Sequence, residues 1–175
     1  MTISHRLSPH RLSHRCGSAT AHLIHGFVGV GKTTYAIQLE QERGAVRFTL
    51  DEWIVFFYGQ DPPEECFEDY HNRVCELIWA FAAYVLRSGQ DVILDFGFWS
   101  RASRDDAREK VRSIGSTSLL HCVTCADDVL KARVLARTQT MPAGALKIDE
   151  SAISCFRARF EPLEPDESYK LVVTT

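Results

Sequence analysis

Short apolar runs alternate along the chain with longer segments in which apolar residues recur every three or four positions. The short runs predict buried strands and the longer segments predict amphipathic helices. The predicted strands cover residues 21–25, 46–50, 91–95, 119–125 and 169–173. The predicted helices cover residues 33–43, 64–87, about 100–113, 127–138 and 149–160. This alternation predicts an α/β fold, a three-layer sandwich around a five-stranded parallel sheet with right-handed crossovers.

Two segments interrupt this pattern. Residues 53–59 are rich in aromatic side chains and end at Asp61-Pro62-Pro63, so we expect a turn-prone segment there. Residues 141–144 read Met-Pro-Ala-Gly, which predicts a mobile loop between two helices.

The first 20 residues differ from the rest in composition. They hold three arginines, four serines, three histidines and no acidic residue. We expect a disordered leader over 1–20, with an over-long start or an organellar transit peptide as the alternatives, and one domain over 21–175. The leader lacks the apolar block of a secretory signal, and no apolar stretch approaches about 18 residues. We therefore expect a cytoplasmic protein without a membrane segment.

Charge narrows the class of partner. The chain has 20 basic and 23 acidic residues, and the leader holds three of the arginines, so the remaining domain is distinctly acidic. Binding to a polyanion depends on clustered cations. Nucleic acid is therefore disfavoured as a substrate.

The most specific motif follows the first predicted strand. The segment Gly-Phe-Val-Gly-Val-Gly-Lys-Thr-Thr over 26–34 matches G-x-x-x-x-G-K-T, the phosphate-binding P-loop, between a strand and a helix. In such a loop backbone N–H groups face the phosphates, the lysine reaches the β- and γ-phosphate oxygens, and the threonine hydroxyl contacts Mg²⁺. The predicted nucleotide-binding residues are Gly26, Val28, Gly29, Val30, Gly31, Lys32, Thr33 and Thr34.

Two carboxylates stand at the carboxyl ends of predicted strands, where ligands bind in such sheets. Asp95 ends an apolar strand in the manner of a Walker B acid, so Thr33 and Asp95 are the predicted magnesium ligands. Asp51 ends another strand and is a candidate general base for an acceptor hydroxyl. For both acids the alternative is a role in capping the segment that follows.

Two arginines, Arg133 and Arg137, are spaced by four on a predicted helix and therefore share one face. They could close over the phosphates and stabilise charge on the transferred group, or they could simply be solvated. With the loop that follows, residues of about 133–150 form a candidate lid that would exclude water.

The acceptor pocket is expected beside the aromatic segments. Its predicted substrate contacts are Trp53, Tyr58, Arg73, Phe98, Trp99 and Arg101, with Phe57 and Asp61 as further candidates. Aromatic walls with a few polar groups are typical of small-molecule sites. Packing of the core is the alternative for these aromatic residues.

Six cysteines are expected to be reduced thiols. Cys122 and Cys125 have the spacing of half a zinc site, but no second pair follows. Asp95-Phe96-Gly97 spells a protein-kinase motif, although the chain has no His-Arg-Asp catalytic loop.

With these residues in place, residues 21–175 resemble the P-loop kinases grouped with AAA-type ATP-binding proteins. That group is related to chloramphenicol phosphotransferase, zeta toxin and the kinase domain of polynucleotide kinase. The motifs that carry the resemblance are GFVGVGKTT, TLDEW followed by FFYGQDPP, VILDFGFWSRASRDDAR and KARVLART. The resemblance implies a sheet ordered 2-3-1-4-5, ATP and Mg²⁺ as cofactors, and a helical substrate-binding insertion over about 53–88. It also implies that Asp51 activates the acceptor hydroxyl and that Arg137 or Arg133 is the lid arginine.

These features favour an ATP-dependent phosphotransferase that acts on a hydroxyl of a small molecule, such as an antibiotic or a metabolite. The apolar residues after Asp95 favour a small, partly hydrophobic acceptor. One alternative is a nucleotide-binding ATPase or switch module that acts through a protein partner. Another is a polynucleotide kinase or a zeta-toxin-like kinase.

Overall fold

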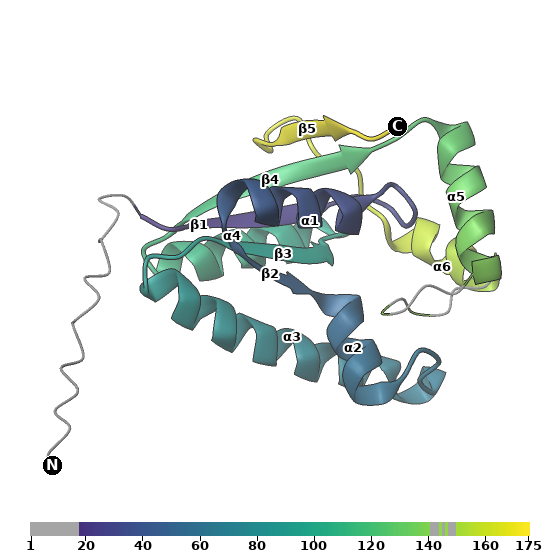
Figure 1. Ribbon diagram of the computed structural model, residues 1–175, viewed down its shortest axis with the longest axis horizontal. Helices are drawn as coiled ribbons and strands as arrows, with labels where there is room; N and C mark the ends of the chain where they lie inside the picture. Colours follow the sequence, from purple (N-terminus) through teal and green to yellow (C-terminus); the bar gives the residue numbers. More distant parts are fainter. Residues whose placement is uncertain (1–17, 141–143, 145, 147–149) are drawn as a thin grey trace, which may run out of the picture.

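A five-stranded parallel sheet forms the centre of the protein in a computed structural model, which describes residues 18–140, 144, 146 and 150–175 (Figure 1). The strand order is β2-β3-β1-β4-β5, which confirms the predicted α/β class and sheet order. The strands are β1 Thr20–His25, β2 Val46–Thr49, β3 Val92–Gly97, β4 Thr117–Thr124 and β5 Lys170–Val173. The helices are α1 Lys32–Arg43, α2 Leu50–Tyr58, α3 Glu64–Arg87, α4 Arg101–Ser113, α5 Asp127–Thr140 and α6 Glu150–Arg159. Most of the predicted leader, residues 1–17, lies outside the described residues.

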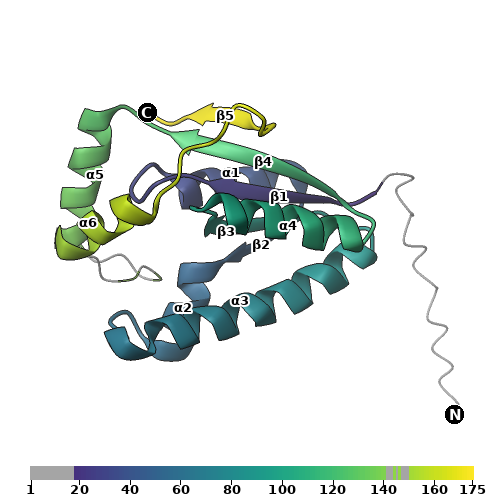
Figure 2. The same cartoon turned by 180° about the vertical axis from the view of Figure 1, so that it is seen from behind.

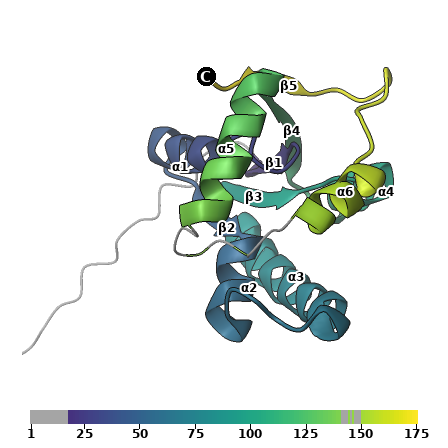
Figure 3. The same cartoon turned by 90° about the vertical axis from the view of Figure 1, so that its right-hand side faces the viewer.

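Helices cover both faces of the sheet. On one face, α1 packs its buried Ala36 and Leu39 against alternate strand residues such as Ile24 and Ile93. On the other face, α3 and α4 pack on the strand residues that alternate with these, such as Leu23 and Leu94. The view in Figure 3 shows α1 and α4 on opposite sides of the strands, and Figure 2 shows α4 in front of the sheet. This alternation confirms the three-layer sandwich.

The elements that surround the carboxyl ends of the strands are α2, α5 and α6 (Figure 1). The loop after β1 lies at the same end, so the residues that follow β1, β2 and β3 converge there. None of the helices in the described part of the chain combines the length and apolar character that a bilayer crossing needs.

The prediction of a turn-prone segment over 53–59 is wrong, because residues 50–58 form helix α2. Aromatic and β-branched residues have only modest helix propensity, which is why the sequence favoured a turn. Here Leu50 and Ile54 are buried against α3 and the sheet, and burial outweighs propensity. The acids of the first turn, Asp51 and Glu52, interact favourably with the helix dipole. Gly59, at φ +84°, ends the helix.

A chain of three polar side chains runs between α1 and the sheet. The Nδ1 of His22 lies 2.9 Å from the Nε2 of His121, and the Nδ1 of His121 lies 2.8 Å from the Tyr35 hydroxyl. Both histidines are buried, and the Nε2 of His22 has no hydrogen-bond partner among the described residues. Burial lowers the pKa of His22 and lowers that of His121 to about 4, because the interior disfavours imidazolium.

This histidine pair predicts that the fold loses stability in mild acid. A histidine whose pKa is lower in the folded state than in the unfolded chain binds fewer protons when folded. Its contribution to stability is therefore complete above about pH 6.5 and is lost as the pH falls toward 4. Asp91 opposes this effect at His22, whereas Arg43 and Lys170 strengthen it at both histidines. Urea unfolding between pH 7 and pH 4 should show the loss, and His121→Gln should flatten the profile more than the control His71→Gln in α3, which lies outside this chain of polar side chains.

Candidate active site

The loop after β1 is held in a conformation that glycine alone permits. Gly26 has φ +156°, and a Cβ there would lie 2.5 Å from the Val123 carbonyl oxygen. Gly29, at φ +84°, would bring a Cβ within 2.9 Å of Val134 on α5. Gly31, at φ +89°, is the N-cap of α1, and its carbonyl accepts the Tyr35 N–H at 3.0 Å. The loop therefore delivers its backbone to the N-terminus of α1, which attracts anions.

Lys32 folds back over this loop. Its Nζ donates to the Phe27 carbonyl oxygen at 2.9 Å. The ammonium group therefore lies above the loop enclosed by Gly26 and Gly31. In this position it places a positive charge beside the loop's N–H groups.

Thr33 links the loop to the neighbouring strand. Its hydroxyl donates to an Asp95 carboxylate oxygen at 2.7 Å. Asp95 follows the apolar residues of β3 and is only 6% exposed. Burial raises the pKa of Asp95, while the charge of Lys32 and the hydrogen bond from Thr33 oppose that increase. The structure thus places a hydroxyl, an ammonium and a buried carboxylate side by side.

Asp51 comes to the same place from the next strand. In the register of β2 and β3, Thr49 pairs with Asp95, and Asp51 follows Thr49 in the first turn of α2. The Asp51 charge contributes to the raised pKa of Asp95, which shows that the two carboxyl groups are within electrostatic reach. Arg47 lowers the pKa of Asp95 and pairs with Glu52 at 3.0 Å. The two acids predicted at strand ends therefore lie at the same edge of the sheet.

Arg133 of α5 also lies against the P-loop. Its guanidinium donates to the Thr174 hydroxyl at 2.9 Å and to the Thr175 carbonyl at 2.6 Å. The Thr174 hydroxyl in turn donates to the Val30 carbonyl at 2.7 Å. A Cβ on Gly31 would lie 3.2 Å from an Arg133 nitrogen, so the arginine reaches the loop itself. Arg137 belongs to α5, but its side chain lies outside the described residues, as do residues 141–143 of the predicted loop.

A tryptophan fixes the start of the P-loop. The chain leaves β3 through Gly97 and Phe98, both at positive φ, and Phe98 at +43° is unusual for a residue with a side chain. The Trp99 indole N–H then donates to the Gly26 carbonyl at 3.0 Å. The Trp99 ring also packs on Phe27 and Phe156. The loop after β3 therefore supports the loop after β1.

Arg104 holds the loop after β3 in place, a role that the sequence analysis missed. It is fully buried on α4, pairs with Glu167 at 2.7 Å, and donates to the carbonyls of Phe98 and Trp99. The hydrogen bond from Arg104 is the largest cause of the low pKa of Glu167, which is about 2. In the sequence Arg104 stands among other arginines of an amphipathic helix, and nothing in that pattern marks it as buried.

Comparison with models of protein families identifies the family of this chain. A family model described as AAA domain matches residues 22–163. The chain belongs to the AAA domain family. No curated protein matches it significantly.

Solved structures agree on the fold. A protein from Chloroflexus aurantiacus J-10-fl, provisionally described as a kinase, superposes with a TM-score of 0.66 at 20% identity over 90% of this chain and 89% of that chain. A sugar kinase from Janibacter sp. HTCC2649 gives 0.62 at 20% identity over 89% and 85%. A chain of the Pnkp1/Rnl/Hen1 RNA repair complex gives 0.66 at 19% identity, over 82% of this chain and 44% of that chain. The AAA domain described here therefore has the fold of P-loop kinases.

Three of the predicted substrate contacts of the AAA domain, Trp53, Tyr58 and Phe98, belong to or pack against one core cluster. Trp99 lies beside the P-loop, and Phe98 is buried in the core. Trp53 packs on Phe48 and Phe81, while Tyr58 stacks on Tyr70 at 3.8 Å.

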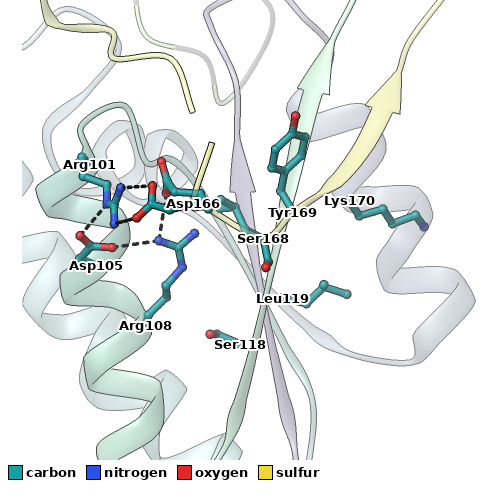
Figure 4. A pocket seen from close by; sticks show the side chains of 11 residues that line it. Arg101, Asp105, Arg108, Ser118, Leu119, Asp166, Ser168, Tyr169 and Lys170 are labelled. Atoms are coloured by element: carbon teal, nitrogen blue, oxygen red, sulfur yellow. Dashed lines mark hydrogen bonds and ion pairs between the residues drawn. The ribbon is translucent and has the colours of Figure 1, made fainter. Parts of the chain in front are cut away.

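The two predicted basic substrate contacts are held by carboxylates. Arg73 pairs with Asp69 on the outer side of α3. Arg101 pairs with Asp105 and Asp166 in a cleft of about 510 Å³ between α4 and the start of β5 (Figure 4). Among the predicted substrate contacts, Trp99 has a hydrogen bond to the P-loop, through its indole N–H and the Gly26 carbonyl.

The donor set of the AAA domain suits a magnesium ion that is shared with a nucleotide. Magnesium is usually held by one or two protein oxygens together with substrate phosphates. The Thr33 hydroxyl and the buried Asp95 carboxylate provide such oxygens. Among the described residues, no group of three or more His, Cys, Asp or Glu side chains could hold a metal by itself. Thr33 and Asp95 are thus the residues that fit the ion.

The contact between Trp99 and Gly26 predicts a defined loss of nucleotide affinity. Trp99→Phe keeps an aromatic ring but leaves the Gly26 carbonyl without its donor, so affinity should fall about threefold to tenfold. The matched control is Trp79→Phe, because Trp79 packs on Phe96 away from the P-loop. Titration with a fluorescent ATP analogue measures both variants. Equal affinities for the two variants would show that the indole N–H does not support the P-loop.

Proposed function

We propose that this AAA domain is an ATP-dependent kinase that transfers the γ-phosphoryl group to a hydroxyl of a small, partly apolar molecule. The observation that carries the proposal is the convergence of Lys32, Thr33, Asp95 and Asp51 at one end of the sheet. A site that only bound a nucleotide would need the first three. The second carboxylate, from a different strand, adds a base for an acceptor.

Each residue has a chemical part in the proposed reaction. The P-loop N–H groups and Lys32 hold and neutralise the β- and γ-phosphates. Thr33 and Asp95 hold magnesium, which offsets charge on the phosphate oxygens when it is bound. Asp51 accepts the proton of the acceptor hydroxyl. At the same time the hydroxyl oxygen of the acceptor bonds to the γ-phosphorus, and the bond between the γ-phosphorus and the ADP oxygen breaks. Arg133, and Arg137 from the same helix, stabilise the charge on the transferred group.

The surroundings of Asp51 indicate the kind of acceptor. The loop after β3 brings Trp99 beside the P-loop. Its ring offers apolar contact area for an acceptor, as in small-molecule sites. A sugar kinase is also among the similar structures. The proposed acceptor is therefore an uncharged or weakly charged hydroxyl compound.

A second candidate is a kinase for the 5′-hydroxyl of an oligonucleotide. The similarity to a chain of an RNA repair complex supports it. The acidic balance of the chain outside the leader argues against it, because a polyanion would be repelled.

The test is acceptor-stimulated release of ADP. Purified protein with ATP is incubated with hydroxylated metabolites, hydroxylated antibiotics and oligonucleotides that carry a 5′-hydroxyl. Stimulation by a small hydroxyl compound, with the phosphorylated compound as product, supports the proposal. Stimulation only by oligonucleotides selects the second candidate. Stimulation only by a protein fraction, with no phosphorylated acceptor, indicates an ATPase module.

A further inference from the structure

Arg104 is a cation buried completely in the interior, near the start of α4. A charge in such a place is costly unless a partner of opposite sign and further hydrogen bonds compensate it. Both carboxylate oxygens of Glu167 accept from Arg104, at 2.8 Å from Nε and at 2.7 Å from Nη2. This two-pronged pair balances the charge, and it leaves the Nη1 group for other acceptors.

The remaining donors of Arg104 meet backbone carbonyls of two segments. Nη1 donates to the carbonyl of Phe98 at 3.3 Å and to that of Trp99 at 3.2 Å, both in the loop after β3. Nη1 also lies 3.3 Å from the carbonyl of Glu161, and Nη2 donates to that of Pro162 at 3.3 Å. One guanidinium therefore joins the loop after β3 to the segment that follows α6.

The loop after β3 is in turn bonded to the start of the P-loop. The Nδ1 of His25 donates to the Phe98 carbonyl at 3.0 Å, the same oxygen that accepts from Arg104. A carbonyl oxygen has two lone pairs and can accept both bonds. The Trp99 indole N–H donates to the Gly26 carbonyl at 3.0 Å. Trp99 alone therefore separates Arg104 from the backbone of the P-loop.

The loop after β3 needs support to keep its shape. Phe98 has φ +43°, a conformation that a residue with a side chain holds only when its surroundings impose it. Arg104 and His25 supply such contacts, because both bond the Phe98 carbonyl. The indole nitrogen of Trp99 lies against the backbone of Gly97, where an added Cβ would be only 2.8 Å away. The place of the indole therefore depends on the backbone that Arg104 holds.

We propose that Arg104 is a positioning residue for nucleotide binding. By fixing the carbonyls of Phe98 and Trp99, it keeps the indole on the Gly26 carbonyl and holds the P-loop in its binding conformation before a nucleotide arrives. A loop that is already ordered loses less conformational freedom on binding, which raises affinity. The inference rests on a nucleotide bound at the P-loop, as the proposed function does, but it does not depend on transfer to an acceptor.

Hydrogen exchange of the indole N–H groups in the nucleotide-free chain tests the first step. Arg104→Lys keeps a positive charge opposite Glu167 but lacks the planar fork that reaches several acceptors. The chain has three tryptophans, and Trp99→Phe identifies the NMR signal of the Trp99 indole. This signal should exchange roughly tenfold faster in Arg104→Lys than in the wild type. The other two indole signals should keep their wild-type rates, whereas a general loss of stability would move all three.

Titration with a fluorescent ATP analogue tests the second step. Arg104→Lys should bind about threefold to tenfold more weakly than the wild type. The double variant with Trp99→Phe should bind about as tightly as Trp99→Phe alone, because both changes remove the same support. The matched control is Arg108→Lys. Arg108 also pairs with Glu167, at 2.9 Å, but donates to neither loop carbonyl in the described contacts, so affinity should stay near the wild-type value.

Glu167→Gln decides the question if Arg104→Lys does not fold. It keeps the size of the side chain and one acceptor oxygen, but removes the charge that orients the guanidinium. It should produce the same selective changes in exchange and affinity by a smaller factor.

The proposal is overturned if the folded variants keep the wild-type exchange rate of the Trp99 indole or the wild-type ATP affinity. Losses from Arg104→Lys and Trp99→Phe that multiply in the double variant would also overturn it. A wild-type chain that binds ATP but phosphorylates no acceptor would instead contradict the proposed function alone.

Discussion

Replacing Asp51 by asparagine is expected to lower the rate of phosphoryl transfer by roughly 10²–10⁴-fold while leaving ATP affinity unchanged. The amide keeps the shape of the side chain but cannot accept the proton of the acceptor hydroxyl. Nucleotide affinity should persist because Lys32, Thr33 and Asp95, which hold the phosphates and magnesium in our proposal, are unaltered. A separation of this kind, with transfer lost and binding kept, distinguishes a general base from a nucleotide ligand.

Glu52 provides a matched control for Asp51. It is the next residue on the same turn of α2, and its carboxylate pairs with Arg47. Glu52→Gln removes a charge of the same sign at nearly the same place, and transfer should stay within a small factor of the wild-type rate. Single-turnover measurements with ATP in excess give the rate, and calorimetric titration gives the ATP affinity. If Asp51→Asn and Glu52→Gln behave alike, Asp51 is not the base.

Replacing Lys32 by alanine is expected to weaken ATP binding and to lower transfer by roughly 10²–10³-fold or more. In the structure the Lys32 ammonium lies over the P-loop on the Phe27 carbonyl, ready to move onto a phosphate. Its positive charge stabilises the reacting phosphates most strongly when negative charge shifts between the γ-phosphoryl group and ADP. Both ground-state binding and the reaction should therefore suffer, in contrast to Asp51→Asn.

Lys170→Ala is the control for the loss of a lysine charge. Lys170 begins β5 and is exposed, and it contacts no residue of the P-loop in the described contacts. Fluorescent-nucleotide titration and the transfer assay should give near wild-type values for this variant. A Lys32→Ala protein that transfers phosphate at the wild-type rate would contradict the placement of the nucleotide on the P-loop.

The centre of the sheet could be predicted from the sequence because β3 is apolar on both faces. Residues 92–94 form an uninterrupted apolar run that only a strand covered by helices on both sides can bury. The meeting of Asp51 and Asp95 could be expected for the same reason, since the carboxyl ends of parallel strands share one edge. The sheet order itself came from the family resemblance.

The residue pattern alone did not predict α2, because its helical state depends on contacts with α3, and a helical insertion over about 53–88 was implied only by the family resemblance. The ion pair of Arg104 and Glu167 was also missed, since it joins residues that are 63 positions apart. Trp99 was recognised as important, but for acceptor binding. Its indole hydrogen bond to Gly26 depends on the positive φ angles of Gly97 and Phe98, which no sequence pattern specifies.

The most direct test of the central claim is the fate of the γ-phosphate in a complete mixture of small molecules. A low-molecular-mass extract is incubated with ATP labelled at the γ-position and either the wild-type chain or Asp51→Asn, and the labelled products are separated and identified by mass spectrometry. The account predicts a labelled, phosphorylated hydroxyl compound with the wild-type chain and its near absence with Asp51→Asn. Label that appears only as free phosphate, or equal amounts of the labelled compound with both proteins, would contradict it.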